Sequence, residues 1–207
     1  MASPDDGPAT SPSNLIETIQ LEHVPSTYTV LVGLFKDVTN AEFLQQQLLS
    51  RNAEYEYAFI DASSVISRLQ VLAAVYKAIT IHMSGSMKTP NIHSEIVCSL
   101  SPNNNISEAY RRFGVTSSSK HLIIIKVLIS PSPATTEAVR QHVLANVSGS
   151  PAPFTDDVLQ AGLTDRVKVR KYYKLNGISW LDAIKDDSLQ RRESELLVLG
   201  SMALRSL

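Results

Sequence analysis

Residues 28–35, YTVLVGLF, constrain the fold more than any other segment of this chain. They are apolar on both sides at their far end, which is typical of a central strand of a β-sheet. In residues 15–23 apolar side chains (Leu15, Ile19, Leu21) alternate with polar ones, and this period of two predicts a half-buried strand. A VPST turn joins the two segments, so we expect them to pair antiparallel.

The remaining segments alternate between helical and strand patterns. Helices are predicted after a capping-box signature at Thr39 and Glu42, over Ser64 to about Met83 with an end near Gly85, over Glu137–Val147, and after the cap Thr155. Strands are predicted at residues 57–61, Ile92–Leu100 and His121–Ile129. This order predicts an α/β (α+β) fold: a mixed, largely antiparallel β-sheet flanked by α-helices, with an amphipathic C-terminal helix.

Length and composition predict one soluble domain. The 207 residues, 43% of them hydrophobic, suffice for one core, so we expect residues 15–207 to form a single domain behind a disordered tail at residues 1–14. The 19 basic and 20 acidic side chains nearly cancel, so any binding to nucleic acid or membrane must be local. A single cysteine, Cys98, excludes an internal disulfide and fits a reducing, intracellular compartment.

The segment Ser99–Val115, SLSPNNNISEAYRRFGV, contains three consecutive asparagines between two predicted elements. Asn105 can cap the following helix, with Glu108 completing a reciprocal cap, and Gly114 can end the helix in the left-handed conformation. The competing helix start is Ser101 as the cap with Pro102 at the first helical position. Asn103 or Asn104 can form an Asx-turn. One asparagine remains unexplained, and it could hold a neighbouring loop or contact a partner.

A local basic segment lies at Arg166–Lys174. Five cations fall within these nine residues beside Tyr172 and Tyr173, which is the chemistry that binds a phosphate backbone and unstacked bases. The candidate RNA contacts are Lys168, Arg170, Lys171 and Lys174, with Arg111 and Arg112, predicted to point outward, as auxiliary contacts. The alternative is a solvated charged face, because runs of charged residues usually form solvated surface rather than a binding site.

The last predicted helix, within ESELLVLGSMAL, has apolar side chains around nearly its whole circumference. Such a helix needs cover on a second side, so its apolar residues are candidates for a partner interface. They are Leu196, Leu197, Leu199, Met202 and Leu204. The alternative is a helix fully buried in the protein's own core.

Residue patterns typical of an enzyme are weak in this sequence. On the predicted strand Cys98 and His93 face opposite sides, which removes a cysteine–histidine pair. His93 and Glu95 share a face but lack a third metal ligand nearby. SGSMKT at residues 84–89 lacks the glycine spacing of a phosphate-binding loop. We therefore expect no catalytic residue, no metal and no cofactor; a free-standing hydrolase and a self-sufficient RNA-binding module are the competing hypotheses.

The segment KTPNIHSEIVCSLSPNNNISEAYRRFGV closely resembles the hallmark of the PRPK-binding protein family, the small kinase-binding subunit of the KEOPS (EKC) complex. The resemblance extends to VLVGLFKDVTNAEFL, to YYKL at Tyr172–Leu175 and to the apolar C-terminal helix. The tail before Leu15 and an insertion at about 176–192, NGISWLDAIKDDSLQRR, depart from the family pattern.

This resemblance implies a non-catalytic subunit whose direct partner is the PRPK-type kinase, with the other KEOPS subunits reached through it. It implies regulation of that kinase's ATPase and support for threonylcarbamoyladenosine modification of tRNA, with the tRNA acceptor end as a further partner. It implies no membrane and no small-molecule substrate. It also implies a nuclear and cytoplasmic location with complex-level links to telomeric chromatin and transcription.

Overall fold

The computed structural model describes residues 12–205, and its centre is an antiparallel β-sheet. Its strands are β1 (Ile16–Ile19), β2 (Tyr28–Lys36), β3 (Ala58–Asp61), β4 (Leu122–Ile129) and β5 (Ser150–Ala152). β2 and β4 lie in the middle and pair from Tyr28↔Ile129 to Phe35↔Leu122. β1 and β5 pair with β2, and β3 pairs with β4. The predicted central strand, its antiparallel pairing with the first strand and the strand at 121–129 are confirmed.

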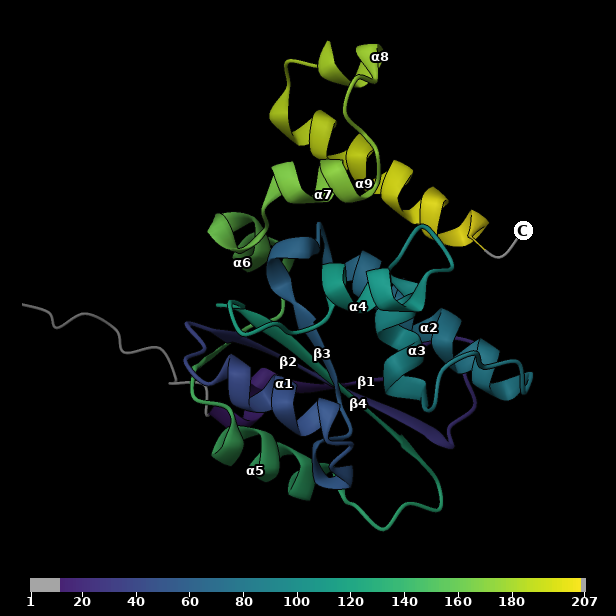
Figure 1. Cartoon of the computed structure of the whole chain (residues 1–207), viewed down its shortest axis with the longest axis vertical. Helices are drawn as coiled ribbons and strands as arrows, with labels where there is room; N and C mark the ends of the chain where they lie inside the picture. Colours follow the sequence, from purple (N-terminus) through teal and green to yellow (C-terminus); the bar gives the residue numbers. More distant parts are fainter. Residues whose placement is uncertain (1–11, 206–207) are drawn as a thin grey trace, which may run out of the picture.

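Helices cover both faces of this sheet (Figure 1). They are α1 (Ala41–Leu49), α2 (Arg68–Met83), α3 (Ile92–Ser99), α4 (Ile106–Phe113), α5 (Thr136–Asn146), α6 (Asp156–Val158), α7 (Arg166–Tyr172), α8 (Ser179–Asp182) and α9 (Asp187–Leu204). Short helical turns are η1 (Pro12–Leu15), η2 (Ala53–Tyr55), η3 (Ala62–Ser64) and η4 (Leu159–Leu163). The predicted fold class, a sheet flanked by helices in one domain, is confirmed.

Alternation along β2 divides the core in two. Val32 and Leu34 belong to the cluster formed with α2, α3, α4, α7 and α9, whereas Leu31 and Phe35 point to the opposite cluster, formed with α1 and α5. Because side chains alternate across a strand, a strand apolar on both sides needs both layers of helices. Figure 1 shows α1 and α5 on one side of the sheet and α2, α3 and α4 on the other.

The C-terminal quarter of the chain forms an outer tier beyond α2 and α4. Figure 1 shows α7, α8 and α9 stacked at that end of the molecule. The predicted insertion at 176–192 supplies α8 and the first turn of α9, and its Leu181 is fully buried in the core. The insertion is therefore anchored by apolar packing. Of the tail predicted over residues 1–14, residues 1–11 lie outside the described residues, and Pro12–Leu15 form η1.

The predicted strand over Ile92–Leu100 is wrong, because this segment forms the helix α3. Asn91 caps the helix, its side chain accepting a hydrogen bond from the Ser94 amide at 2.8 Å. Polar residues such as His93 and Ser99 are buried, so their alternation with apolar residues did not report solvent exposure. Two predictions that assumed a strand are therefore also wrong. His93 and Glu95 are not placed on one face of a strand, and strand alternation does not separate Cys98 from His93.

Two helix starts differ from the sequence prediction. The Thr39–Glu42 capping box is absent: Asn40 occupies the cap position without a side-chain cap bond, and Thr39 Oγ1 donates to the Ser148 carbonyl instead at 3.2 Å. The long helix α2 starts at Arg68 because Ala62–Ser64 form η3. None of the helices among residues 12–205 combines the length and apolar character that crossing a bilayer requires.

Candidate functional site

The corner before α4 is built mainly by its asparagines. The Asn105 side chain accepts a hydrogen bond from the Glu108 amide at 3.0 Å, which confirms the predicted cap. Asn103 Oδ1 accepts from the Asn105 amide at 3.0 Å, which confirms an Asx-turn. The reciprocal cap by Glu108 is wrong, since its carboxylate accepts from Asn103 Nδ2 at 2.7 Å and pairs with Arg112.

Gly114 ends α4 for a reason other than the predicted one. Its φ of −74° and ψ of 165° are extended, so the left-handed conformation is not required. A Cβ at this position would instead lie 2.7 Å from the Tyr110 carbonyl oxygen. The glycine therefore permits the backbone at residue 114 to lie close to the carbonyl group of Tyr110 in the last turn of α4.

The two arginines of α4 have different surroundings. Arg112 does not point outward as predicted: its guanidinium stacks 5.1 Å from the Tyr172 ring centroid, and Nη1 donates to the Tyr172 carbonyl at 3.2 Å. It thereby ties α4 to α7. Arg111 is 72% exposed and has only a long contact with Glu108, at 3.7 Å. Of the pair, Arg111 alone presents an available charge.

Most cations of the predicted basic segment are neutralised by acidic residues. Arg166 pairs with Asp187 at 2.6 Å, Lys168 with Asp61 at 3.1 Å, and Arg170 with Asp182. Lys171 and Lys174 are exposed, and neither forms an ion pair within residues 12–205. The segment forms α7, so its positive charge holds the outer tier together as well as facing solvent.

The two tyrosines of that segment pack against the protein, Tyr173 fully and Tyr172 in part. Tyr173 is buried; its hydroxyl donates to the Leu100 carbonyl and accepts from Gln70 Nε2 at 2.7 Å. Burial raises the pKa of Tyr173 far above its ordinary value. The Tyr172 ring meets Phe113 edge-on. Neither ring offers a free stacking platform.

The C-terminal helix α9 buries one stripe and exposes another. Val198 and Met202 lie in the core, with Met202 only 3% exposed, so Met202 is not available as the predicted interface residue. Leu197 packs partly against the core, and Leu199 is half-buried. Leu196 and Leu204 are 55% and 65% exposed. The helix is therefore neither fully covered nor fully open.

Helix α2 exposes an apolar stripe that its spacing alone does not separate from the core. The helical spacing predicts one apolar face, made of Val65, Leu69, Leu72, Tyr76, Ile79 and Met83. Val65 and Ile79 are buried, whereas Leu69, Tyr76 and Met83 are exposed, and Val71 and Ala78 are fully buried in their place. α2 is apolar on both sides, which was the missed signal. α2 packs against α9, and Lys77 Nζ donates to the Met202 carbonyl at 2.6 Å. We call the exposed side chains of Leu69, Tyr76, Leu196 and Leu204 the α2–α9 face.

A cavity of about 660 Å³ opens beside the edge strand β3, between the end of α1, η2, α3 and α4. Its lining includes aromatic, amide and basic side chains: Tyr57, Tyr110, Gln45, Asn52, Asn91, Arg51 and Arg111. Sequence reasoning found only Arg111 of this set, because the lining comes from separate elements that no local pattern connects.

A buried histidine forms one wall of this cavity. His93 Nε2 accepts from the Val127 amide at 3.0 Å, so Nδ1 carries the proton and donates to Glu56 Oε1 at 3.2 Å. Burial lowers the pKa of His93, and the hydrogen bond from His93 lowers the pKa of Glu56. Burial also lowers the pKa of Lys126, whose Nζ donates to the Glu56 carbonyl at 2.6 Å. These contacts fix the cavity wall.

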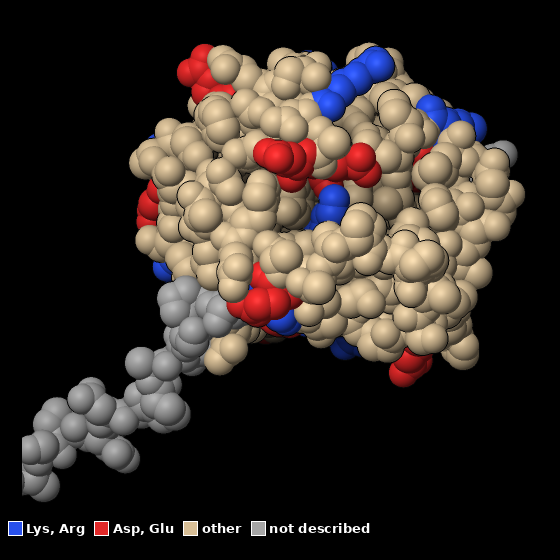
Figure 2. Space-filling view, turned by 90° about the horizontal axis from the view of Figure 1, so that it is seen from below, with Lys and Arg blue, Asp and Glu red and all other residues tan. Residues whose placement is uncertain are grey.

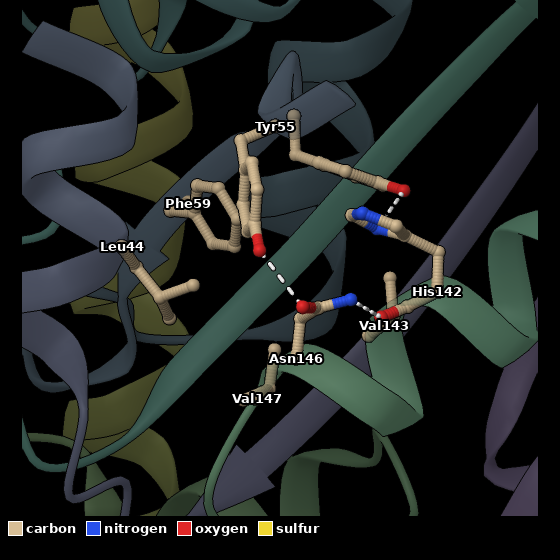
Figure 3. Close-up of a pocket in the computed structure, with 8 residues that line it drawn as sticks. Leu44, Tyr55, Phe59, His142, Val143, Asn146 and Val147 are labelled. Atoms are coloured by element: carbon tan, nitrogen blue, oxygen red, sulfur yellow. Dashed lines mark hydrogen bonds between the residues drawn. The ribbon is translucent and has the colours of Figure 1, made fainter. Parts of the chain in front are cut away.

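A second crevice, between η2, β3 and α5, is closed by its own side chains. Figure 3 shows the hydroxyl of Tyr55 bonded to Asn146, whose amide bonds in turn to the His142 carbonyl. The Tyr57 ring stacks on His142, and burial raises the pKa of Tyr57 to about 12. The crevice has no room for a water molecule, so its role is structural.

The charged side chains of the described residues are spread over the surface, and the thiol of Cys98 is buried. Figure 2 shows acidic and basic residues scattered over the face seen from below Figure 1. Among residues 12–205 no group of three His, Cys, Asp or Glu could hold a metal ion. Cys98 is buried and its pKa is raised by that burial to about 11, so its thiolate is disfavoured.

Comparison with known proteins places these surfaces in a family context. Residues 35–206 match the family described as kinase binding protein CGI-121. The chain is 50% identical over 194 residues to the EKC/KEOPS complex subunit CGI121 of Gibberella zeae, an alignment that covers 92% of this chain and 98% of that protein. The corresponding subunit of Aspergillus terreus is 46% identical over 195 residues (93% and 98%), and that of Schizosaccharomyces pombe 36% over 147 residues (71% and 82%).

Proposed function

This chain belongs to the kinase binding protein CGI-121 family, and we propose that it is the kinase-binding subunit of an EKC/KEOPS complex. The observation that carries the proposal is the match over residues 35–206 together with relatives that bear the name of this subunit. In this role the chain binds a PRPK-type kinase, regulates its ATPase and performs no catalysis itself.

We place the kinase on the α2–α9 face. Leu196 and Leu204 on α9 are more than half exposed, and on the packed helix α2 Leu69 is 53% and Tyr76 42% exposed. Large apolar side chains exposed on two helices that pack together are candidates for a partner-binding site. An apolar helical face fits a hydrophobic surface of the partner by the helix-in-groove mode of recognition.

The test introduces a charge on this face without entering the core. Leu196→Glu and Leu204→Glu should lower the affinity for the kinase by a factor of about ten or more, since losing a central apolar contact costs about 1.4 kcal/mol or more. Arg192→Glu, an exposed change of charge earlier on α9, is the matched control and should leave the affinity within about twofold. Full kinase affinity of folded Leu196→Glu and Leu204→Glu proteins would remove this face from the proposal.

The wider role proposed for the complex is tRNA modification. We propose that the chain supports threonylcarbamoyladenosine formation by helping to hold the tRNA acceptor end, and that it acts in the nucleus and cytoplasm, with the complex linked to telomeric chromatin and transcription. The resemblance of the Asn103–Asn105 segment to the family hallmark supports these proposals.

The cavity beside β3 favours a contact with single-stranded RNA. Arg51 and Arg111 supply positive charge, Tyr110 an aromatic ring, and neighbouring amides hydrogen-bond donors and acceptors. Lys171 and Lys174 add exposed charge on α7 and the loop after it. Lys168, Arg170 and Arg112 are engaged within the fold, so we assign them a structural role rather than RNA contact.

Charge reversal separates the two basic regions. Arg111→Glu and Lys171→Glu should each weaken tRNA retention by the assembled complex. Each lost contact should also make the negative slope of log affinity against log salt concentration less steep by about 0.7. Arg192→Glu again serves as the control. Retention and salt slope unchanged in both variants would exclude RNA contact at these residues. Undiminished tRNA affinity of the isolated chain, without kinase, would favour a self-sufficient RNA-binding module.

A further inference from the structure

We propose that Asn104 and Arg205 form a latch that holds the last turn of α9 in the orientation needed for kinase docking. The inference rests on the proposed function, because it concerns the same docking helix. It also assigns a role to the one asparagine of the corner that local structure leaves unexplained.

The side-chain hydrogen bonds of Asn104 are made with a residue outside the corner. Asn103 and Asn105 satisfy the turn and the helix cap, as described above. The Asn104 side chain instead accepts from Arg205 Nε at 3.0 Å and donates to the Arg205 carbonyl at 3.3 Å. Within residues 12–205 its side chain forms hydrogen bonds only with Arg205, 101 residues further along the chain. Figure 1 shows the loop before α4 rising to the end of α9.

Two further bonds complete the latch. The Arg205 guanidinium donates to the Cys98 carbonyl near the end of α3, and Lys77 Nζ from α2 donates to the Met202 carbonyl. The last four carbonyls of a helix have no partner inside the helix, and Lys77 satisfies one of them at Met202. The Arg205 bond instead fastens the residue after α9 to the end of α3. α2, α3 and the corner thus converge on one helical turn.

The latched turn carries part of the α2–α9 face. Leu204 directly precedes Arg205 and is 65% exposed, so the Arg205 bonds fix the backbone from which this docking side chain projects. When only a fraction of molecules holds the binding-competent conformation, the apparent affinity falls by that fraction. Asn104 is therefore a positioning residue that acts on the kinase through α9.

The experiment compares Asn104→Ala, Arg205→Ala and the double variant in the full chain. Amide hydrogen exchange in residues 200–205 of the free protein should accelerate in each, and kinase affinity should fall by about threefold to tenfold. The double variant should lose little more than the worse single variant, because both remove one interaction. Asn104→Asp keeps the acceptor for Arg205 Nε and should restore affinity. Ser107→Ala, an exposed change in the first turn of α4 for which no side-chain hydrogen bond is seen within residues 12–205, is the matched control and should leave exchange in the last turn unchanged.

The outcomes separate the latch from the docking proposal. Unchanged exchange in Asn104→Ala, or additive losses in the double variant, would overturn the latch even if Leu204→Glu abolishes kinase binding. Faster exchange with full kinase affinity would overturn the positioning role. Leu204→Glu and Leu196→Glu with full affinity would overturn the docking face itself, whatever the exchange data show.

Discussion

Lys168 is predicted to stabilise the fold rather than bind RNA, and Lys168→Ala tests this directly. Its Nζ lies 3.1 Å from Asp61 Oδ2 and 2.7 Å from Ser63 Oγ, joining α7 to the end of β3. The Lys168 and Asp61 side chains are 27% and 11% exposed, so the pair is largely withdrawn from solvent. Since Lys168 is the ion-pair partner found for Asp61 among residues 12–205, removing the ammonium leaves this carboxylate unpaired within the described structure.

The magnitude follows from what Asp61 keeps. Its carboxylate still accepts from the Ser63 amide at 2.9 Å and from Ser119 Oγ at 3.3 Å, and water can reach the vacated position. The loss should therefore be about 1.5–2 kcal/mol, the lower part of the range for hydrogen bonds to charged groups. In a domain of this size that corresponds to a fall of about 3–8 °C in Tm.

The assay is thermal and urea unfolding of Lys168→Ala beside Lys171→Ala, which removes an exposed lysine three residues away on the same helix. The control should change the free energy of unfolding by less than about 0.5 kcal/mol. A Tm of Lys168→Ala equal to that of the control would show that the Asp61 bond carries no stability. The assignment of Lys168 to the fold would then be wrong.

Three further perturbations test the corner, the buried histidine and the insertion. Gly114→Ala and Gly114→Asn should both cost about 1–3 kcal/mol in unfolding free energy, since any Cβ meets the Tyr110 carbonyl; a well-tolerated Asn would instead indicate a left-handed requirement. Burial lowers the pKa of His93 in the folded state, so below pH 6.5, the ordinary pKa of histidine, the unfolded chain binds a proton that the folded chain does not. The free energy of unfolding should therefore decrease as the pH is lowered. The loss should reach at most about 1.4 kcal/mol from pH 7.5 to 5.5, and His93→Gln should flatten it in unfolding titrations. Leu181→Ala should cost about 2–4 kcal/mol in urea unfolding; a cost below 0.5 kcal/mol would show that the insertion is not part of the core.

The elements that were predicted correctly have local patterns that match their environment. β2 and β4 are nearly continuous apolar runs, and only a sheet covered on both faces accommodates them side by side. The cap at Asn105 and the Asx-turn at Asn103 depend on residues within three positions, so the sequence contains all of their partners. Such features can be predicted because the interaction and the pattern have the same short range.

α3 was missed because its surroundings hide its period. Ile92 and Ile96 are spaced for a helix as well as for a strand, and a helix buried nearly all round has no polar face to decide between them. The polar residue His93 is retained inside by specific bonds to Glu56 and the Val127 amide. Periodicity reports solvent exposure, and burial of polar groups with distant partners removes that signal.

The surfaces depend on partners far away in the sequence. Five cations in nine residues predict a basic patch, but Lys168 meets Asp61, which is 107 residues earlier in the chain. The carboxylate was visible in the sequence, while its position opposite α7 was not. Local charge density therefore overstates the field that a ligand meets when opposite charges converge through the fold.

The exposed surfaces of the apolar helices α2 and α9 likewise depend on packing that the local sequence does not reveal. Their sequences contain more apolar residues than one buried stripe needs, and on α2 the set predicted from spacing proved to be partly buried, at Val65 and Ile79, and partly exposed, at Leu69 and Tyr76. Val71 and Ala78 are buried in the core cluster, and α2 packs against α3 and α9, which leaves Leu69 and Tyr76 outside. An excess of apolar side chains thus predicts that a second surface exists, while packing against elements that are distant in the sequence decides which residues form it.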